Sequence, residues 1–253
     1  MSPVAAQVES AARRLRGVLV ETPLVGGVIL PGFDVPPGLR VHLELVQHGG
    51  SLWFRGSMHA LARALGAPRE VVAIGSDAAL VASCLAAHLQ RVPVTAIARG
   101  ERRVGLETQL LAFGASVVEW RADADAVAER ADALRRERGA RVLPGPGDPD
   151  FDLGVATLGR ELAQGLGADA DLVVVAPAAL AAAVDMGLGA AGREIRVVGV
   201  DAATPSEIDS VGRADLAEAV ATGLRVVPGP ASIAALIRGM TASAVAPCVV
   251  LGE

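Results

Sequence analysis

The strongest constraint on the fold is a regular alternation between short β-branched runs and longer helical stretches, which begins at Val71. The runs are almost continuously apolar, whereas half-exposed strands would alternate apolar and polar residues. Strands of this kind, separated by helices, are typical of parallel sheets covered on both faces, so the sequence predicts an α/β protein. The predicted strands are Val71–Ile74, Val92–Ala98, Ser116–Trp120, Leu172–Ala176, Ile195–Asp201 and Cys248–Leu251, and the predicted helices are Ala78–Gln90, Gly105–Phe113, Asp123–Arg138, Gly154–Leu166 and Ser232–Met240.

Two segments outside this alternation carry their own signals. Ser2-Pro3 is a hydroxyl cap followed by proline, and Gly17 stands where a C-terminal cap belongs, so we expect a helix between them. Residues 144–149, PGPGDP, form the most loop-like stretch and predict a crossing between two lobes.

Composition excludes several classes of protein and partner. With 52% hydrophobic and 20% charged residues, the chain is too apolar to be intrinsically disordered. Pro, Gly or charged residues interrupt every apolar run well before the ~20 residues of a membrane-spanning helix.

The net charge of −5, the scattered basic residues and the small set of four Phe and two Trp disfavour a nucleic-acid partner. Cys84 and Cys248 lie in apolar runs without metal-ligand spacing, so no metal site is expected. No targeting segment is recognisable near the N-terminus, and the expected location is the cytoplasm.

All 23 basic residues are arginine, and the sequence contains no Lys, Asn or Tyr. Coding bias against A/T-rich codons explains this skew more simply than selection does. The chemical consequence is the same in either case. Imine formation with an aldehyde cofactor needs a primary amine, and Lys is the only side chain that carries one.

Short motifs in a fixed order extend the interpretation from fold class to family. Residues 21–24, ETPL, are followed by residues 41–57, VHLELVQHGGSLWFRGS, and later by residues 198–201, VGVD. In this order the motifs resemble the fold-type II pyridoxal-phosphate enzymes, the group of threonine dehydratase, serine racemase and cysteine synthase. The matching residues are Glu44, Gln47, Gly50, Ser51, Arg55, Gly56, Gly114, Ala115, Gly154, Thr157, Gly159 and Glu161, followed by Pro228–Leu236 and a final strand.

The resemblance implies two lobes whose largely parallel sheets are flanked by helices. The large lobe would comprise residues 1–40 and 145–253, and the small lobe residues 41–144. Between Asp201 and Val226 the chain lacks several tens of residues that the family uses in its large lobe. We therefore expect that lobe to be truncated.

The chain departs from the family at the positions that hold the cofactor. Trp53 stands where the family has the Lys that binds pyridoxal phosphate, and an indole N–H is a donor without nucleophilicity. The family's Ser-Gly-Asn-His turn reads SDAA at residues 76–79, which lacks the amide that bonds the pyridine hydroxyl. Its glycine-rich phosphate loop is shortened to APAAL at residues 176–180, where proline removes an amide donor and alanines narrow the approach. Its terminal Ser-Gly-Gly segment is reduced to LGE at residues 251–253, and we expect no cofactor.

The resemblance and its departures predict a catalytically degenerate pseudoenzyme that acts as a non-catalytic partner or regulatory subunit. Related α/β enzymes commonly form symmetric dimers, so we expect a homo-oligomer or a hetero-oligomer with an active homologue. The alternative is a cofactor-independent enzyme of the lyase, hydratase or isomerase type, or a small-molecule binder, that uses the former cofactor cleft. The sequence does not decide whether the chain is an enzyme.

The residues of that former cleft are the candidate ligand-binding residues, and none is assigned a catalytic role. Each also has a structural interpretation, since a hydroxyl or carboxylate can cap a helix and an arginine can pair with a carboxylate. On this interpretation Ser51 and Asp77 cap the helices that follow them. His59, four residues from Arg55 on the same predicted helix, is a further candidate for a ligand site. The cleft residues are Ser51, Trp53, Arg55, Ser76, Asp77 and Ala178, with His48 and Glu44 at the mouth.

Overall fold

The computed structural model describes residues 2–26, 40–64, 68–175, 177–201, 227–228 and 246–251. These residues belong to two compact units, each of which is described by itself. The first unit comprises residues 1–10, 21–45 and 155–253, and the second comprises residues 11–20 and 46–154. The lobe boundaries expected from the sequence stay a prediction. The predicted helix Ser232–Met240, most of the motif Pro228–Leu236 and the segment between Asp201 and Val226 lie outside the described residues.

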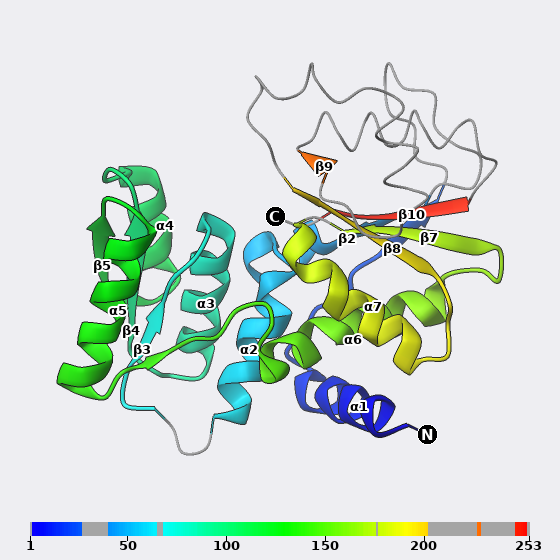
Figure 1. The fold of residues 1–253 in the computed structure, drawn as a ribbon, viewed down its shortest axis with the longest axis horizontal. Coiled ribbons are helices and arrows are strands. Elements are labelled where there is room, and N and C mark those ends of the chain that lie inside the picture. Colours follow the sequence, from blue (N-terminus) through cyan, green and yellow to red (C-terminus); the bar gives the residue numbers. More distant parts are fainter. Residues whose placement is uncertain are drawn as a thin grey trace. The chain divides into compact units, whose positions relative to one another are not determined.

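The second unit is built on a four-stranded parallel sheet with the strand order β5-β4-β3-β6 (Figure 1). Successive side chains of β3 point to opposite faces, as the strand period of two requires. Val71 and Ala73 pack under two helices, α3 and α4, whereas Val72 packs under α5 on the other face. Both faces of this sheet are therefore covered, which confirms the α/β prediction. The elements are β3 (Val71–Ala73), α3 (Asp77–Leu89), β4 (Val94–Arg99), α4 (Val104–Ala112), β5 (Ala115–Arg121), α5 (Ala124–Arg138) and β6 (Arg141–Val142).

The first unit contains a six-stranded sheet with the order β1-β2-β10-β7-β8-β9 (Figure 1). Its strands run parallel except for β1, which pairs antiparallel with β2 at one edge. The last strand of the chain, β10, lies between β2 and β7 and joins segments that are far apart in the sequence. The strands are β1 (Leu24–Gly26), β2 (Arg40–Leu43), β7 (Ala170–Val175), β8 (Arg196–Asp201), β9 (Val227–Pro228) and β10 (Ala246–Leu251).

Helices α6 (Pro149–Gly165) and α7 (Ala181–Ala190) cross closely in the first unit. A Cβ atom on Gly159 would overlap the backbone carbonyl oxygen of Val184, and one on Gly187 would overlap that of Ala156. Glycine is therefore required on both helices because the two backbones meet there. Gly159, one of the residues that carried the family resemblance, has a packing function in this chain.

Helix α6 begins five residues earlier than the predicted start at Gly154. The Asp148 carboxylate accepts hydrogen bonds from the backbone N–H groups of Asp150 and Phe151, at 2.9 and 3.1 Å. Pro149 then occupies the first helical position, where its missing N–H costs nothing. The loop predicted over residues 144–149 therefore ends at Asp148, and Pro149 belongs to the helix.

The N-terminal helix α1 (Pro3–Leu15) forms as predicted, and the Ser2 hydroxyl accepts a hydrogen bond from the Ala5 N–H at 3.2 Å. Helix α2 (Trp53–Arg63) follows two short 3₁₀ turns, Glu44–Val46 and His48–Gly50, in the motif-rich segment. Among the described residues, no helix is long and apolar enough to cross a membrane.

Candidate functional site

The segment around Trp53 opens helix α2 in the second unit. The Trp53 backbone N–H donates to the Ser51 hydroxyl at 3.2 Å, and the Phe54 N–H donates to the Ser51 carbonyl, also at 3.2 Å. Ser51 is buried, and its polar atoms satisfy the first turn of the helix. The sequence predicts Ser51 as the cap of this helix; the N-cap position is taken by Leu52, and Ser51 bonds the helix start from one residue earlier.

The Trp53 indole is half-buried and packs on apolar side chains of the second unit. Its ring lies 5.7 Å from that of Phe151, centroid to centroid, at an interplanar angle of 57°. Leu15, Phe54 and Met58 belong to the buried cluster against which the indole packs. An amphipathic ring in this environment has one part in the core and another in contact with solvent.

Arg55 and His48 lie on either side of this helix start in sequence. The Arg55 side chain is completely buried, which takes its guanidinium out of contact with solvent. Its backbone carbonyl lies so close to Gly154 of α6 that a Cβ atom there would overlap it. His48 packs edge-on against Phe54, with 5.1 Å between ring centroids. The His48 ring is thus packed within the second unit.

The first turn of α3 holds the other predicted pair, Ser76 and Asp77. The Ser76 hydroxyl accepts a hydrogen bond from the Ala79 N–H at 3.2 Å and is the N-cap of the helix. Asp77 pairs with Arg103 through two hydrogen bonds of 2.6 and 2.8 Å, which raise the pKa of the Arg103 guanidinium. The interpretation of Asp77 as the cap is thus wrong. Ser76 is the N-cap instead, because the cap position precedes the first helical residue.

Ala178 lies in the first unit, in the short 3₁₀ turn Ala178–Leu180 that precedes α7. Pro177, which has no N–H, accepts a hydrogen bond from the Leu180 N–H at 3.0 Å. On the other side, strand β8 approaches so closely that a Cβ atom on Gly199 would lie 2.7 Å from the Ala178 Cα. Of the six predicted ligand-binding residues, five therefore belong to the second unit and Ala178 to the first.

Glu44 joins a buried polar cluster in the first unit. The Thr22 hydroxyl donates to a Glu44 carboxylate oxygen at 2.6 Å, and His42 Nδ1 lies 3.5 Å from the same oxygen. His42 Nε2 is 3.3 Å from the Thr22 hydroxyl. Two motifs that lie about twenty residues apart, ETPL and the segment starting at Val41, are thus tied together by side-chain contacts.

His59 has a structural environment that the sequence did not reveal. Its Nδ1 lies 2.6 Å from the Asp150 backbone oxygen, which can only accept, so Nδ1 carries the proton. Its Nε2 therefore accepts from the Arg14 guanidinium at 3.1 Å. Burial is the main cause that lowers the pKa of His59, and it favours the neutral form of the ring. His59 therefore links α1, α2 and α6.

The cysteines offer no nucleophile. Burial raises the pKa of both Cys84 and Cys248 to about 12, so the reactive thiolate is negligible at neutral pH. Within the described ranges, no group of three or more His, Cys, Asp or Glu side chains could hold a metal ion.

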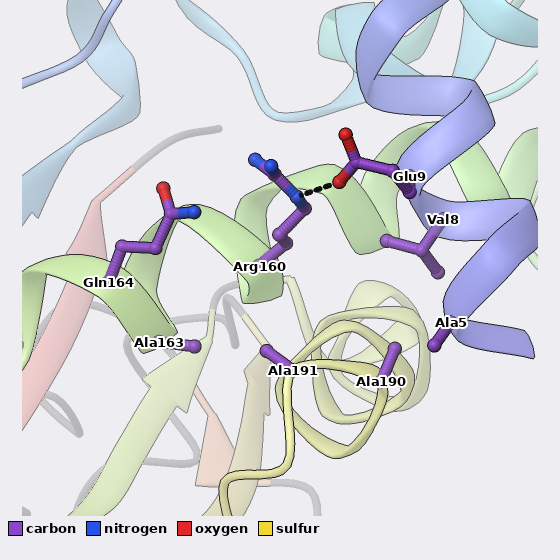
Figure 2. A pocket seen from close by; sticks show the side chains of 8 residues that line it. All are labelled: Ala5, Val8, Glu9, Arg160, Ala163, Gln164, Ala190 and Ala191. Carbon is purple, nitrogen blue, oxygen red and sulfur yellow. Dashed lines mark hydrogen bonds and ion pairs between the residues drawn. The ribbon is translucent and has the colours of Figure 1, made fainter. Parts of the chain in front are cut away.

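A pocket of about 290 Å³ lies in the first unit, where α1, α6 and α7 meet (Figure 2). One side carries an ion pair, in which Arg160 Nε donates to Glu9 at 2.7 Å. The rest of its wall is mostly alanine. Its sequence signal is weak, because Glu9 and Arg160 lie on helices 151 positions apart in the sequence. The lining residues are Ala5, Val8, Glu9, Arg160, Ala163, Gln164, Ala190 and Ala191.

Comparison with known proteins identifies related sequences and folds. The sequence model of a family described as "Pyridoxal-phosphate dependent enzyme" matches residues 17–246. The serine racemase of Dictyostelium discoideum has a similar structure, with a TM-score of 0.74 at 14% identity, covering 98% of this chain and 97% of that one. The processed form of threonine deaminase isoform 2 from Solanum lycopersicum aligns with a TM-score of 0.73 at 16% identity, over 100% of this chain and 90% of its own. Maize serine racemase gives 0.68 at 17% identity, over 98% and 76%. No curated protein matches the chain.

Proposed function

The chain belongs to the family of pyridoxal-phosphate dependent enzymes, and from this premise we propose that it has kept the family's fold and lost its cofactor chemistry. One observation carries the proposal. The sequence has no Lys, and the position that resembles the family's cofactor lysine holds Trp53, whose indole packs on Phe151 at the start of α2. No side chain can supply the primary amine that the family's chemistry requires.

The residues that the chain shares with the family support this proposal through the work they do here. The Gln47 amide bonds both the N–H and the carbonyl of Val20, at 3.1 and 3.0 Å. Gly56 leaves room for the Phe151 ring, which would lie 2.5 Å from an added Cβ atom. Gly154 and Gly159 likewise lack a Cβ atom where the backbone of a neighbouring helix approaches closely. These matches serve packing, so they are explained by the fold without any catalytic requirement.

The residues at the position of the phosphate loop do not fit a phosphate group. A phosphate cradle needs several backbone N–H groups that converge on open space. Pro177 has no N–H, and the backbone of β8 at Gly199 lies against Ala178. The altered lysine, amide and phosphate-loop positions all disfavour pyridoxal phosphate, and we derive no catalytic step through it.

The role we propose is that of a non-catalytic partner or regulatory subunit, either as a homo-oligomer or with an active, lysine-bearing homologue. Support comes from exposed apolar side chains on α4 and on the neighbouring edge strand β5. Val104 is 69% exposed, and Leu111 and Val117 are about half exposed. Val104 and Leu111 lie seven residues apart and share one face of α4, whereas Val117 is on the sheet face opposite to Val118 and Trp120, which pack toward α4. Exposed apolar side chains that share a helix face are typical of association sites.

The experiment is co-expression with lysine-bearing homologues from the same source, followed by size-exclusion chromatography with light scattering. We expect a stable oligomer, and we expect the activity of the lysine-bearing homologue to change when the chain is present. Val104→Asp with Leu111→Asp should dissociate it, whereas the exposed control Arg136→Asp should not. A monomer that neither binds a homologue nor alters its activity would contradict the role.

A second candidate function rests on the partial exposure of Trp53. If a small molecule binds near the indole, either as the substrate of a cofactor-independent reaction or as a ligand, the fluorescence of Trp53 should change. Trp120 is the only other tryptophan, so Trp120→Phe isolates the signal. A saturable change upon screening small metabolites would favour this function over the partner role. No response would leave the partner role as the better proposal.

A further inference from the structure

The pocket between α1, α6 and α7 combines a small apolar floor with a charged rim. Ala163 of α6 and Ala190 of α7 contribute methyl groups to the floor, and Val8 of α1 closes it from the other side (Figure 2). Pockets for drug-sized ligands enclose about 300–1,000 Å³. At about 290 Å³, this pocket lies at the lower end of that range and has room for a small molecule.

The rim places one guanidinium in a fixed orientation. Arg160 uses its Nε to donate to Glu9 at 2.7 Å, and the two terminal nitrogen atoms lie on the side away from Glu9 (Figure 2). Within the described part of the chain, those terminal nitrogens make no hydrogen bond. Glu9 thus orients the guanidinium through one edge and leaves the other edge available.

A second donor stands beside the free edge. Gln164 follows Arg160 by four residues on α6, so the two side chains lie on the same face of the helix. Two parallel N–H groups of a guanidinium match the two oxygens of a carboxylate, and an amide can donate to the same group. The Glu9 carboxylate also lines the pocket, but it is already paired with Arg160 on the opposite edge, which reduces its repulsion of an incoming anion.

We propose that this pocket binds a short-chain monocarboxylate, with the carboxylate on the terminal nitrogens of Arg160 and the alkyl chain on the alanine floor. The inference is independent of the proposed function, because the pocket lies wholly within the first unit and involves neither Trp53 nor the surface of α4 and β5. It assigns a binding site to a part of the molecule that the family's cofactor positions do not include.

The test uses the full chain with ¹³C-labelled alanine methyl groups, observed by NMR. Isobutyrate should produce saturable shifts of the pocket methyls, whereas isobutyramide, which has the same shape without the charge, should produce none. This comparison needs no variant and so does not depend on folding of a mutant. Equal binding of both compounds, or no saturable binding of isobutyrate, would overturn the proposal.

Variants then place the bound ligand in the pocket. Arg160→Met should weaken isobutyrate binding by about tenfold or more, the range for a charged hydrogen bond. Ala190→Leu should abolish it by filling the floor while leaving the Arg160–Glu9 pair in place. The matched control Arg63→Met removes another paired arginine, 3.2 Å from Asp150, and should leave binding unchanged. Unchanged binding in Arg160→Met, or equal losses in Arg63→Met, would overturn the assignment.

Discussion

Replacement of Trp53 by alanine measures how far the indole serves the core of the second unit. The indole packs on Phe151 and on the buried cluster that contains Leu15, Phe54 and Met58. Truncation of a fully buried tryptophan costs about 3–5 kcal/mol through lost transfer energy and a residual cavity. Because part of this ring is already exposed, we expect Trp53→Ala to lower the free energy of unfolding by about 2–4 kcal/mol.

The ring contact, and not the indole N–H, should account for most of that loss. Trp53→Phe keeps an aromatic ring next to Phe151 and should therefore cost less than about 1.5 kcal/mol. Urea unfolding followed by far-UV circular dichroism gives both values without relying on tryptophan fluorescence. Arg136→Ala, at an exposed residue of α5, is the control and should change stability by less than about 0.5 kcal/mol.

The reasoning fails if Trp53→Ala costs no more than the Arg136 control. That result would show that the indole does not hold the second unit together. It would favour the alternative in which the ring is displayed to a ligand. A loss in the expected range, with a mild effect of phenylalanine, would support a packing role.

Three further perturbations test other parts of the structure. Gly159→Ala should cost at least about 3 kcal/mol, because the new methyl group meets the Val184 carbonyl. The control Gly105→Ala, with open space around it, should instead stabilise α4 by about 0.4–1 kcal/mol. Equal effects of the two variants in urea unfolding would refute the close crossing of α6 and α7. The pKa of His59 is lowered from 6.5 in the folded state, so the unfolded chain binds more protons, and the free energy of unfolding should fall as the pH drops below about 6.5. His59→Gln should flatten this part of the profile of stability against pH. An unchanged slope would contradict the assignment. Ser76→Ala should cost about 1 kcal/mol as the loss of a cap, and Asp77→Ala less than that, because its pair with Arg103 is exposed; the reverse order would show that Asp77 has a larger role.

The parallel sheets could be predicted from sequence because their strands are short, β-branched and almost wholly apolar. The antiparallel β1 and the central position of β10 could not, since pairing between distant segments leaves no local pattern. Helix α7 was missed because it is apolar nearly all round and contains two glycines, so it has no amphipathic period. The early start of α6 depends on Asp148, a single capping side chain inside a segment rich in Pro and Gly.

The candidate site shows the same division between local and long-range information. The role of Ser51 at the start of α2 follows from its position just before a helix, whereas the cap of α3, predicted at Asp77, lies one residue earlier, at Ser76. The contacts of His59 with Arg14 and Asp150 join residues 45 and 91 positions away, which no spacing rule connects. Glu9 and Arg160 are separated by 151 positions, so the pocket they border became visible only in the folded chain.

Restoring the lysine tests the loss of cofactor chemistry most directly. Trp53→Lys supplies the missing primary amine at the family position, while Ala78, Pro177 and Ala178 stay unchanged. Titration with pyridoxal phosphate, followed by imine absorbance and by mass spectrometry after borohydride reduction, reports binding at that residue. We predict no stoichiometric adduct at residue 53, because the phosphate and ring contacts are still absent. Tight, stoichiometric labelling of that lysine would show that the chain has kept a working cofactor pocket and would contradict the proposal.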